Sequence, residues 1–360
     1  MSAAIPLREG AVVPLARPLR VSVVIKALNE ERHIRASIES AIQAVMRVGG
    51  EVILADSGST DRTVEIAREY PVTVVQLKHP AERRCGIGPQ LGYQKARGEF
   101  VYILDGDMEL DPAFLPEALA AMDADSRIGG IAGLVEEESD ASYQFRGRKR
   151  RGHERKVRVC EWLDMGGLYR AEALRDVGYF SNRNLHAFEE MELGLRLCAA
   201  GWTLRRVATR GVLHHGRVEG NWPLLVRRWK SRYLDGTGEL IRASIGRPYF
   251  YRALQTQQHL FVGLLVWAGL LLGLAVAPVT PLPLVGILAA VVGLVLVRAR
   301  RIGSLADAWF GQLVWQVTSL AMVRGLFART RNPTEPIEYV LVHEAPGPRP
   351  VAQVGPQRPL

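Results

Sequence analysis

A long segment without charged residues is the feature that most constrains how this chain can fold. No Lys, Arg, Asp or Glu occurs between residues 259 and 297 of the 360-residue sequence, whereas charged residues are spread through the part that precedes it. An apolar helix of about 20 residues is long enough to cross the hydrocarbon core of a bilayer. We therefore expect a globular domain followed by a membrane module. The alternative is a buried hairpin within a soluble protein.

Two apolar runs inside this segment predict a helical hairpin. The first covers residues 259–277 and the second residues 284–297, with a proline-rich break between them. The second run is short, so it spans a bilayer only if it borrows turn residues, tilts or thins the membrane locally. Arginines precede and follow the hairpin and none lies in its loop. The positive-inside rule therefore puts both flanks in the cytoplasm.

The segments beside the hairpin are expected to lie against the membrane. Residues 221–257 are basic and aromatic, which suits anionic headgroups, although a solvated amphipathic face is the alternative. Polar residues at three- to five-residue intervals in residues 305–327 give a helix there one polar stripe, which favours an interfacial or re-entrant helix over a third span. The expected division of the chain is a flexible N-terminal segment 1–19, a globular domain 20–220, a basic juxtamembrane segment 221–257, a transmembrane hairpin 258–298, an interfacial or re-entrant helix 299–330 and a flexible tail 331–360.

Charge and cysteine content narrow the choice of partners and compartment. Lys plus Arg number 46 and Asp plus Glu 37, a net charge of +9, which suits anionic lipid, phosphorylated ligands or nucleic acid. The basic residues cluster beside the hairpin and no nucleic-acid motif appears, so nucleic acid is not expected as a partner. Cys85, Cys160 and Cys198 lack metal-ligand spacing and are expected to be free thiols. The N-terminus does not resemble a secretory signal, which favours a cytoplasmic domain.

Strand and helix patterns alternate in the first part of the chain. Strand-like apolar runs occupy residues 21–25, 51–54, 72–75 and 100–104, and helical patterns lie between them. This alternation predicts an α/β domain with a parallel sheet and helices on both faces. Ligands of such sheets bind beyond the carboxyl ends of the strands. The residues that follow each strand are therefore the candidates for function.

Polar and acidic residues follow three of these strands. They are Lys26–Glu31 after the first, Asp56–Asp61 after the second and Asp105–Asp107 after the fourth. No glycine-rich G-x-G-x-x-G turn follows the first strand, which disfavours a dinucleotide-dependent oxidoreductase. Two carboxylates one residue apart at a strand end can hold a hard divalent cation that also binds nucleotide phosphates.

The motifs occur in a recognisable order within residues 20–220. They are VSVVIKALNEE, VILADSGSTD, GEFVYILDGD, the segment Met165–Arg170 and FEEMELGLRL. As a set they resemble the family 2 inverting glycosyltransferases with a GT-A fold. The resemblance implies a Rossmann-like, mostly parallel α/β sheet that binds a nucleotide-diphospho-sugar. It also implies a nucleotide-sugar donor, for which a UDP-sugar is expected, and Mn2+ or Mg2+ as the cofactor.

The resemblance implies donor-binding residues at the strand ends. Asp56 is expected against the base or ribose, although Ser57 stands where many relatives have a second acid, so either residue of the pair can face the base. Asp105 is expected near the ribose or in contact with the metal through water. Asn29 and Glu30 are expected to bind the donor as well. Arg84 is expected at the diphosphate, with a solvated loop as the alternative.

The resemblance also implies metal-binding and catalytic residues. Asp107 is the expected direct metal ligand, and His214 is expected near the metal or diphosphate, with a structural role as its alternative. Glu190 matches the acid that serves as catalytic base, and Glu189 is the alternative because the usual Glu-Asp pair is Glu-Glu here. On a helix, residues three apart share a face, so Glu189 and Glu192 are expected together while Glu190 points elsewhere.

Departures from the family pattern limit what the resemblance implies. Lys26 and Leu28 replace a Pro and an aromatic residue, so the identity of the donor does not carry over. Leu225 stands at the Gln position of the Gln-x-x-Arg-Trp signature of processive synthases, and one hairpin provides too few spans for a polymer channel, so the expected enzyme is non-processive. The basic run Arg146–Arg158 is either a solvated helix or a contact with anionic lipid.

The expected function is metal-dependent, inverting transfer of one sugar from a nucleotide-sugar to a lipid-linked saccharide during synthesis of a cell-surface polysaccharide. A polyprenyl phosphate is the alternative acceptor. A non-catalytic GT-A membrane scaffold is the alternative from another class. The expected location is a bacterial-type inner (plasma) membrane, with the catalytic domain in the cytoplasm.

Overall fold

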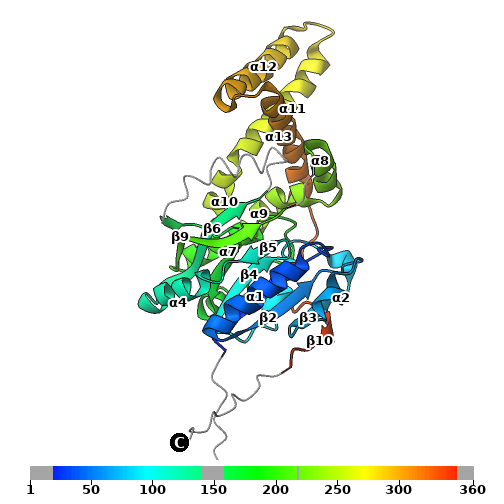
Figure 1. Cartoon of the computed structure of the whole chain (residues 1–360). Helices are drawn as coiled ribbons and strands as arrows, with labels where there is room; N and C mark the ends of the chain where they lie inside the picture. Colours follow the sequence, from blue (N-terminus) through cyan, green and yellow to red (C-terminus); the bar gives the residue numbers. More distant parts are fainter. Residues whose placement is uncertain (1–18, 139–157, 165, 217–218, 347–360) are drawn as a thin grey trace, which may run out of the picture.

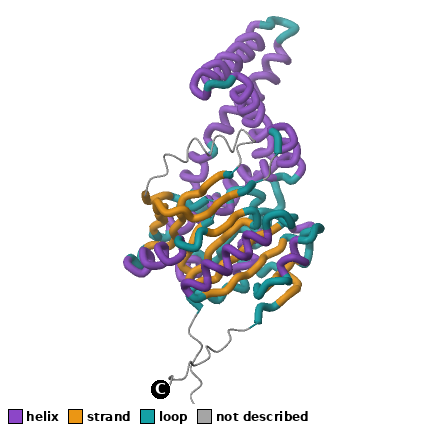
Figure 2. The backbone as a smooth tube through the Cα atoms, in the orientation of Figure 1, coloured by secondary structure: helices purple, strands orange, loops and turns teal. Residues whose placement is uncertain are grey.

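A mixed sheet forms the centre of the globular part, and a bundle of helices projects from one end of it (Figures 1 and 2). The computed structural model describes residues 19–138, 158–164, 166–216 and 219–346. Within these residues one path of the sheet runs β10-β3-β2-β1-β4-β8-β6-β9-β5, and β7 pairs with β9. The basic run Arg146–Arg158, which was a candidate lipid contact, lies almost wholly outside the described residues.

The strands and helices are assigned as follows. The strands are β1 Val21–Ala27, β2 Gly50–Asp56, β3 Thr73–Leu77, β4 Phe100–Asp105, β5 Met108–Leu110, β6 Ile128–Glu137, β7 Arg158–Cys160, β8 Gly167–Arg170, β9 Thr203–His214 and β10 Tyr339–His343. The helices are α1 Ile34–Val48, α2 Thr63–Ala67, α3 Ile87–Tyr93, α4 Phe114–Ala124, α6 Ala171–Asp176, α7 Glu189–Ala199, α8 Asn221–Lys230, α9 Gly236–Ser244, α10 Phe250–Thr256, α11 Gln258–Val276, α12 Leu282–Ile302 and α13 Leu305–Leu326. Two short 3-10 helices are η1 Pro80–Glu82 and η2 Tyr233–Asp235.

The central strand β1 is apolar because both of its faces are covered. Its residues 21–25 are fully buried. Val23 and Ile25 pack on one face with α1, and Val24 packs on the other with α3. Strands covered on both sides are continuous apolar runs rather than alternating ones. This explains why the apolar sequence of β1 predicts a strand without reference to the rest of the chain.

The parallel sheet predicted from the sequence forms the core of the observed one. β1 pairs in parallel with β2 and β4, and β2 pairs in parallel with β3, so four strand ends meet at one edge. The outer strands differ from the prediction. β8 pairs antiparallel with β4, β5 pairs antiparallel with β9, and β10 pairs antiparallel with β3. The sheet is therefore mixed, with its parallel part placed where the polar strand ends are.

The prediction of a flexible tail from residue 331 is wrong for β10. This strand pairs with the outer side of β3, from Tyr339 opposite Leu77 to His343 opposite Val74. The segment before it is fixed through Ile337, whose N–H donates to Gln94 at 2.7 Å and whose carbonyl accepts from the same side chain at 3.0 Å. An open strand edge favours such pairing, and the surrounding Pro and Gly residues obscured the short strand pattern.

Two helices have the length and composition to cross a membrane. They are α11 and α12, with mean hydropathies of 2.2 and 2.4 over their most apolar windows. Few of their side chains are buried by the rest of the chain, and Leu271, Leu272 and Leu274 are each more than 60% exposed (66%, 67% and 64%). The two helices are connected at residues 277–281 and coincide with the hairpin predicted at residues 258–298. Their exposed apolar surface is typical of lipid contact rather than of a buried core.

Helix α13 connects this hairpin to the globular domain. Its Ser319 lies against Gly263 of α11, and Gln316 accepts a hydrogen bond from Trp267 at 3.2 Å. Its last turns pack on α9, where Gly238 and Gly325 let the two backbones approach closely. The helix runs alongside both the hairpin and α9 (Figure 1), so it is a structural connector whatever its depth in a membrane.

We expect the close approach of α9 and α13 to tolerate no side chain at Gly238. A Cβ atom there would lie 1.9 Å from the carbonyl oxygen of Met322. Gly238→Ala should therefore lower the free energy of unfolding by about 2 kcal/mol, a typical cost of overpacking. Gly286→Ala is the matched control, because a Cβ there has no atom within 4 Å. Denaturation followed by tryptophan fluorescence in detergent tests this, and equal stability of the two variants would contradict the packing described.

Candidate active site

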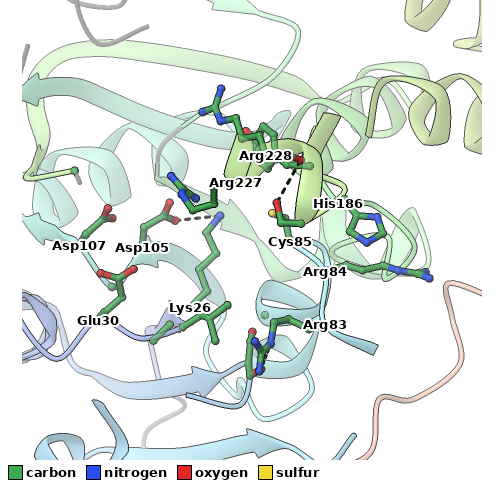
Figure 3. A pocket seen from close by; sticks show the side chains of 18 of the residues that line it. Lys26, Glu30, Arg83, Arg84, Cys85, Asp105, Asp107, His186, Arg227 and Arg228 are labelled. Carbon is green, nitrogen blue, oxygen red and sulfur yellow. Dashed lines mark hydrogen bonds and ion pairs between the residues drawn. The ribbon is translucent and has the colours of Figure 1, made fainter. Parts of the chain in front are cut away.

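One cavity opens at the carboxyl ends of β1, β2 and β4. Its volume is about 440 Å³, and α8 closes it from the side of the hairpin. Its lining includes four acidic residues and several basic ones, many of which Figure 3 shows. The charged and polar residues that line it are Lys26, Glu30, Ser57, Arg83, Arg84, Cys85, Asp105, Asp107, His186, His214, Glu219, Arg227, Arg228, Ser231 and Tyr233. The expectation that ligands bind beyond the carboxyl ends of the parallel strands therefore located the cavity correctly.

Asp56 does not line this cavity. It is fully buried, and its Oδ2 atom accepts hydrogen bonds from the N–H groups of Gly58 and Ser59 and from the Gln76 side chain, each at 2.9 Å. These bonds hold the turn that follows β2. The adjacent Ser57 lines the cavity instead. Of the two residues expected at the base or ribose, Ser57 is the one in position to contact a ligand.

Asn29 and Glu30 join the loops that follow β1 and β2. Asn29 has a positive φ of 57°, and its side-chain oxygen accepts from the Thr60 N–H at 2.8 Å. The Glu30 N–H donates to Thr63 Oγ1 at 2.8 Å, while the Glu30 side chain lines the cavity near Asp105 and Asp107 (Figure 3). Asn29 is thus a loop-fixing residue, and Glu30 adds a third carboxylate to the acidic side.

Asp107 and His214 meet because β5 pairs with β9. Met108 lies opposite His214 in the register, which brings His214 Nε2 to 3.4 Å from Asp107 Oδ2. His214 Nδ1 lies 2.7 Å from Glu137. Burial alone would lower the pKa of His214, but the two carboxylates raise it to about 9. Burial opposes ionisation of Asp107, yet the hydrogen bond and charge of His214 outweigh it and hold the pKa of Asp107 below its usual value.

The acidic side suits a divalent cation that is shared with a ligand. Mg2+ is usually bound through one or two carboxylates together with substrate phosphates rather than by a complete protein cage. Asp105 and Asp107 offer such carboxylates, and His214 lies beside them. Among the described residues no three His, Cys, Asp or Glu groups form a ready metal cluster. The donor set therefore fits a cation completed by a diphosphate.

Lys26 is a residue of the site to which the sequence prediction gave no role. Its Nζ atom lies 3.1 Å from Asp105, 3.2 Å from Glu189 and 4.0 Å from Glu190. Burial would lower its pKa, but these carboxylates outweigh burial and raise the pKa well above its usual value. Lys26 lies near the end of β1, in the polar segment that the sequence singled out after the first strand, but no role had been assigned to it.

The three glutamates of α7 divide differently from the prediction. Glu189 and Glu190 both face Lys26, whereas Glu192 is fully buried and bonds Arg196 twice at 2.9 Å. Glu189 and Glu192 are both buried, as their spacing predicts, but Glu190 also faces Lys26 instead of pointing elsewhere. The first turn of α7 lies over the end of β1, where the Lys26 cation attracts two consecutive carboxylates. Glu192 holds the helix in place and is not exposed to a ligand.

Glu190 has the properties of a poised acid-base group. Burial raises its pKa to about 8, with Glu189 and Asp105 adding to the effect and Lys26 opposing it. Its side chain is 26% exposed, against 10% for Glu189. Neither glutamate lines the large cavity, and both line a smaller pocket beside Pro89 and Tyr169. Lys26 therefore lies between these glutamates and Asp105 at the edge of the cavity.

Arg83 and Arg84 have different roles. Arg83 donates to the carbonyls of Ser57 and Gly58 at 2.9 and 2.8 Å and so fixes the loop after β2. Arg84 lines the cavity beside His186 (Figure 3). Burial lowers the pKa of Arg84, and nearby arginines add to this effect. Arg84 therefore lies in the cavity lining rather than in a solvated loop, and its contact with a diphosphate stays a prediction.

Helix α8 supplies a basic wall opposite the acidic strand ends. Arg227 and Arg228 line the cavity, and Arg228 lies over the ring of Tyr233 at 4.7 Å. On the same helix Trp222 is 61% exposed and Leu225 is buried against α13. The segment expected only to contact headgroups therefore also forms part of the site.

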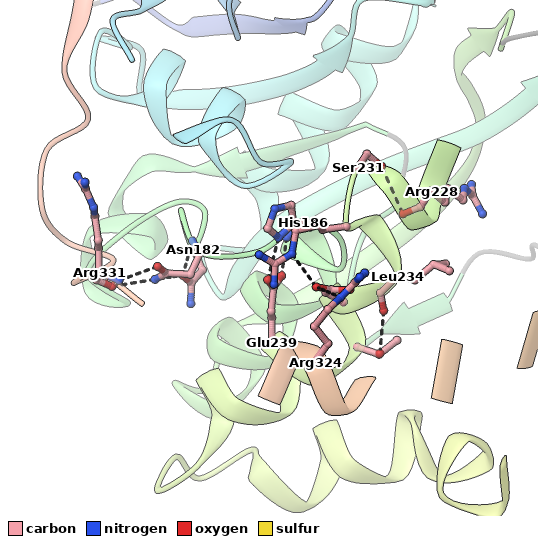
Figure 4. A network of polar contacts seen from close by, with 12 residues as sticks. Asn182, His186, Arg228, Ser231, Leu234, Glu239, Arg324 and Arg331 are labelled. Carbon is pink, nitrogen blue, oxygen red and sulfur yellow. Dashed lines mark hydrogen bonds and ion pairs between the residues drawn. The ribbon is translucent and has the colours of Figure 1, made fainter. Parts of the chain in front are cut away.

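A buried carboxylate fastens this wall to α13. Asp235 is fully buried at the end of η2 and bonds Arg324 of α13 at 2.5 to 2.9 Å and Arg232 at 2.9 Å. Arg324 also lies over the ring of Trp229 at 4.4 Å. Figure 4 shows Arg324 reaching toward the turn that follows α8. The cavity wall and the apolar hairpin are thereby held in one framework.

Comparisons with known proteins agree with this geometry. The model of the family described as glycosyl transferase family 2 matches residues 22–178. The dodecaprenyl-phosphate galacturonate synthase of Rhizobium johnstonii is 29% identical over 113 residues, which are 29% of this chain and 33% of that protein. The undecaprenyl-phosphate 4-deoxy-4-formamido-L-arabinose transferase of Pectobacterium carotovorum is 34% identical over 104 residues, which are 27% and 31% of the two chains. The matched region spans about a third of these relatives.

A solved structure shares the fold over most of the chain. The mannosyltransferase PcManGT of Pyrobaculum calidifontis, in complex with GDP-Man and Mn2+, superposes with a TM-score of 0.58 at 19% identity. The superposition covers 87% of this chain and 88% of that one. The fold is therefore the GT-A fold.

Removal of the Lys26 cation should destabilise the site in a pH-dependent way. Lys26→Met leaves three carboxylates close together, so we expect a loss of about 3 kcal/mol in unfolding free energy at pH 8, as for a broken buried ion pair. The loss should shrink at pH 5, because burial raises the pKa of both Asp105 and Glu190 and protonation then removes part of the carboxylate charge that Lys26 faces. Denaturation at both pH values measures this.

The control for this variant is Lys78→Met. Lys78 is half exposed and pairs with Glu338 at 2.6 Å, so its loss should cost no more than about 1 kcal/mol at either pH. Equal losses for Lys26→Met at pH 5 and pH 8 would show that Lys26 does not neutralise the carboxylates.

Proposed function

We propose that this chain is a family 2 glycosyltransferase, the family whose model matches residues 22–178, and that it transfers one sugar from a nucleotide-sugar to a lipid-linked acceptor at a membrane surface. One observation carries the proposal. The cavity has acidic strand ends on one side and, on the other, a basic helix fixed to an apolar hairpin. A charged donor and a membrane-bound acceptor can meet only in a site with both features.

The acidic side is the proposed donor site. Ser57 and Glu30 would contact the nucleoside, and Asp105 and Asp107 would face the diphosphate. Asp107, with His214 beside it, would hold Mn2+ or Mg2+, which when bound neutralises charge on the diphosphate leaving group. The similar PcManGT structure contains GDP-Man and Mn2+, which supports this assignment. A UDP-sugar remains the expected donor and is the first to test.

Glu190 is the proposed general base. When the acceptor is a hydroxyl, inverting transfer requires a base that takes its proton as the oxygen attacks the anomeric carbon, whereas a phosphate monoester is already largely ionised at neutral pH. A base works best when its pKa lies near the working pH, and the Glu190 pKa of about 8 meets this condition. Glu189 is closer to Lys26 and less exposed, which supports Glu190 over Glu189. Lys26 would hold both side chains in place over the strand ends.

The basic side favours a polyprenyl phosphate as the acceptor. Arg84, Arg227 and Arg228 would face an acceptor phosphate, and guanidinium groups bind phosphate oxygens well. Relatives named for dodecaprenyl phosphate and undecaprenyl phosphate support this choice over the lipid-linked saccharide. The hairpin would place the cavity at the inner leaflet, with both flanks in the cytoplasm.

Donor use should depend on Asp107. With Mn2+ or Mg2+ and a lipid extract, we expect one of the UDP-, GDP- or dTDP-sugars to release its nucleotide diphosphate, and Asp107→Asn to lower the rate at least about 100-fold by losing charge neutralisation. Asp123→Asn is the matched control, because Asp123 is a half-exposed surface partner of Arg20 and does not line the cavity. A fully active Asp107→Asn would contradict the metal assignment.

The same assay distinguishes the two candidate acceptors and the non-catalytic scaffold. Transfer to purified undecaprenyl phosphate supports a polyprenyl phosphate as the acceptor. Transfer only to a diphosphate-linked saccharide would instead identify the lipid-linked saccharide as the acceptor. Nucleotide binding without turnover on either acceptor supports the scaffold.

With a hydroxyl acceptor, activity should rise with pH because Glu190 must be ionised to act as a base. With a pKa of about 8, the rate should increase from pH 6.5 to pH 9 and level off above the pKa. Glu190→Gln should lower kcat by about 100-fold or more, the usual contribution of a general base. Glu189→Gln should retain most of the activity. The reverse order of the two variants would move the base to Glu189.

A further inference from the structure

A second cavity lies between α9 and the segment that follows α13. Its volume is about 180 Å³, and it shares no lining residue with the proposed active site. Its polar lining consists of Tyr179, Asn182, Asn184, Glu239, Arg242, Arg247, Arg329, Thr330 and Arg331. Figure 4 shows Asn182, Glu239 and Arg331 on this side of the molecule. Four of these residues are arginines, and one is acidic.

The charges of the second cavity are not balanced within the protein. Its one carboxylate, Glu239, accepts from the His186 N–H and lies 2.8 Å from the His186 ring nitrogen. Arg331 is paired with Glu82 at 2.8 Å. In the described part of the chain Arg242, Arg247 and Arg329 take part in no ion pair. Three arginines without an ion pair therefore line one hollow together with a single carboxylate.

Arg242 provides a second, independent observation at this cavity. Its Nη1 atom is buried and has no hydrogen-bond partner among the described residues. Buried polar groups in folded proteins are nearly always hydrogen-bonded, and a charged donor without a partner is especially unfavourable. An acceptor within the cavity would remove this cost.

We propose that the second cavity binds a phosphate group. Phosphate oxygens match the paired donors of guanidinium groups, and several arginines around one hollow are the usual arrangement for such an anion. The cavity lies next to the hairpin in the chain, since Arg247 precedes α10 and α11 and Arg329 directly follows α13. Basic pockets at this position favour the headgroups of anionic lipids, and a free phosphate has the same chemistry.

Ligand binding to the purified full-length chain in detergent tests the proposal. Inorganic phosphate, at constant ionic strength against chloride, should raise the melting temperature of the natural chain by several degrees, as expected for a ligand that binds only the folded state. In the second arm, native mass spectrometry should detect bound phosphatidylglycerol but not phosphatidylcholine. Arg242→Gln should lower the affinity about tenfold or more in whichever arm gives binding, and Arg329→Gln should also weaken it.

Arg301→Gln is the matched control, because Arg301 is exposed at the end of α12 and lies outside the cavity. Arg242→Gln should not be less stable than the natural chain without ligand, since it removes an unpartnered charge. Binding of phosphate alone assigns the site to a soluble anion, and binding of the lipid assigns it to a headgroup. Equal binding by Arg242→Gln and Arg301→Gln, or no binding in either arm, would overturn the proposal. These readouts do not depend on sugar transfer.

Discussion

The attraction between Lys26 and the carboxylates of two different elements holds the proposed site together. Asp105 ends β4 and Glu189 begins α7, and without a cation their charges would push the helix away from the sheet. The Lys26 cation at the end of β1 lets both approach. Glu190 is brought to the same place, where burial gives it a high pKa. The arrangement of the acidic edge thus depends on one basic side chain.

The second structural dependence runs from the hairpin to the cavity. α13 packs along α11 and ends against α9, and its Arg324 bonds the buried Asp235 beside the basic wall. Helix α8, which carries the arginines of the basic wall, is thereby fixed to the apolar hairpin rather than to the sheet. In the proposed function this connection places a membrane-bound acceptor opposite a soluble donor. The nucleotide side is built by the sheet and the acceptor side by helices.

The predictable part of this molecule was its local pattern. The apolar runs of β1 to β4, the acidic strand ends and the hairpin are each readable from a few neighbouring residues, and the structure contains all of them. Their convergence at one edge follows from the geometry of a parallel sheet. Glu30, Asp105 and Asp107 were found in this way, and they line the cavity.

The unpredicted part depends on contacts between distant segments. Asp56 turned inward because Gln76 and two N–H groups of its own turn satisfy it, which no strand-end rule reveals. β10 joins the sheet across more than 250 residues of sequence, and its pattern is too short to read alone. Glu192 separates from Glu189 because Arg196 and two tyrosines bind it. These partners come together only in the folded chain, so the spacing of residues in the sequence does not reveal them.

The most direct test of the central claim is the electron paramagnetic resonance of Mn2+ bound to the full-length chain with a nucleoside diphosphate. The account requires a cation shared between the acidic strand ends and a diphosphate, since the described residues form no complete metal cluster. It predicts weak Mn2+ binding to the chain alone, and tight binding with phosphorus hyperfine coupling when the nucleotide is present. Tight Mn2+ binding without the nucleotide, or a complex without phosphorus coupling, would contradict it.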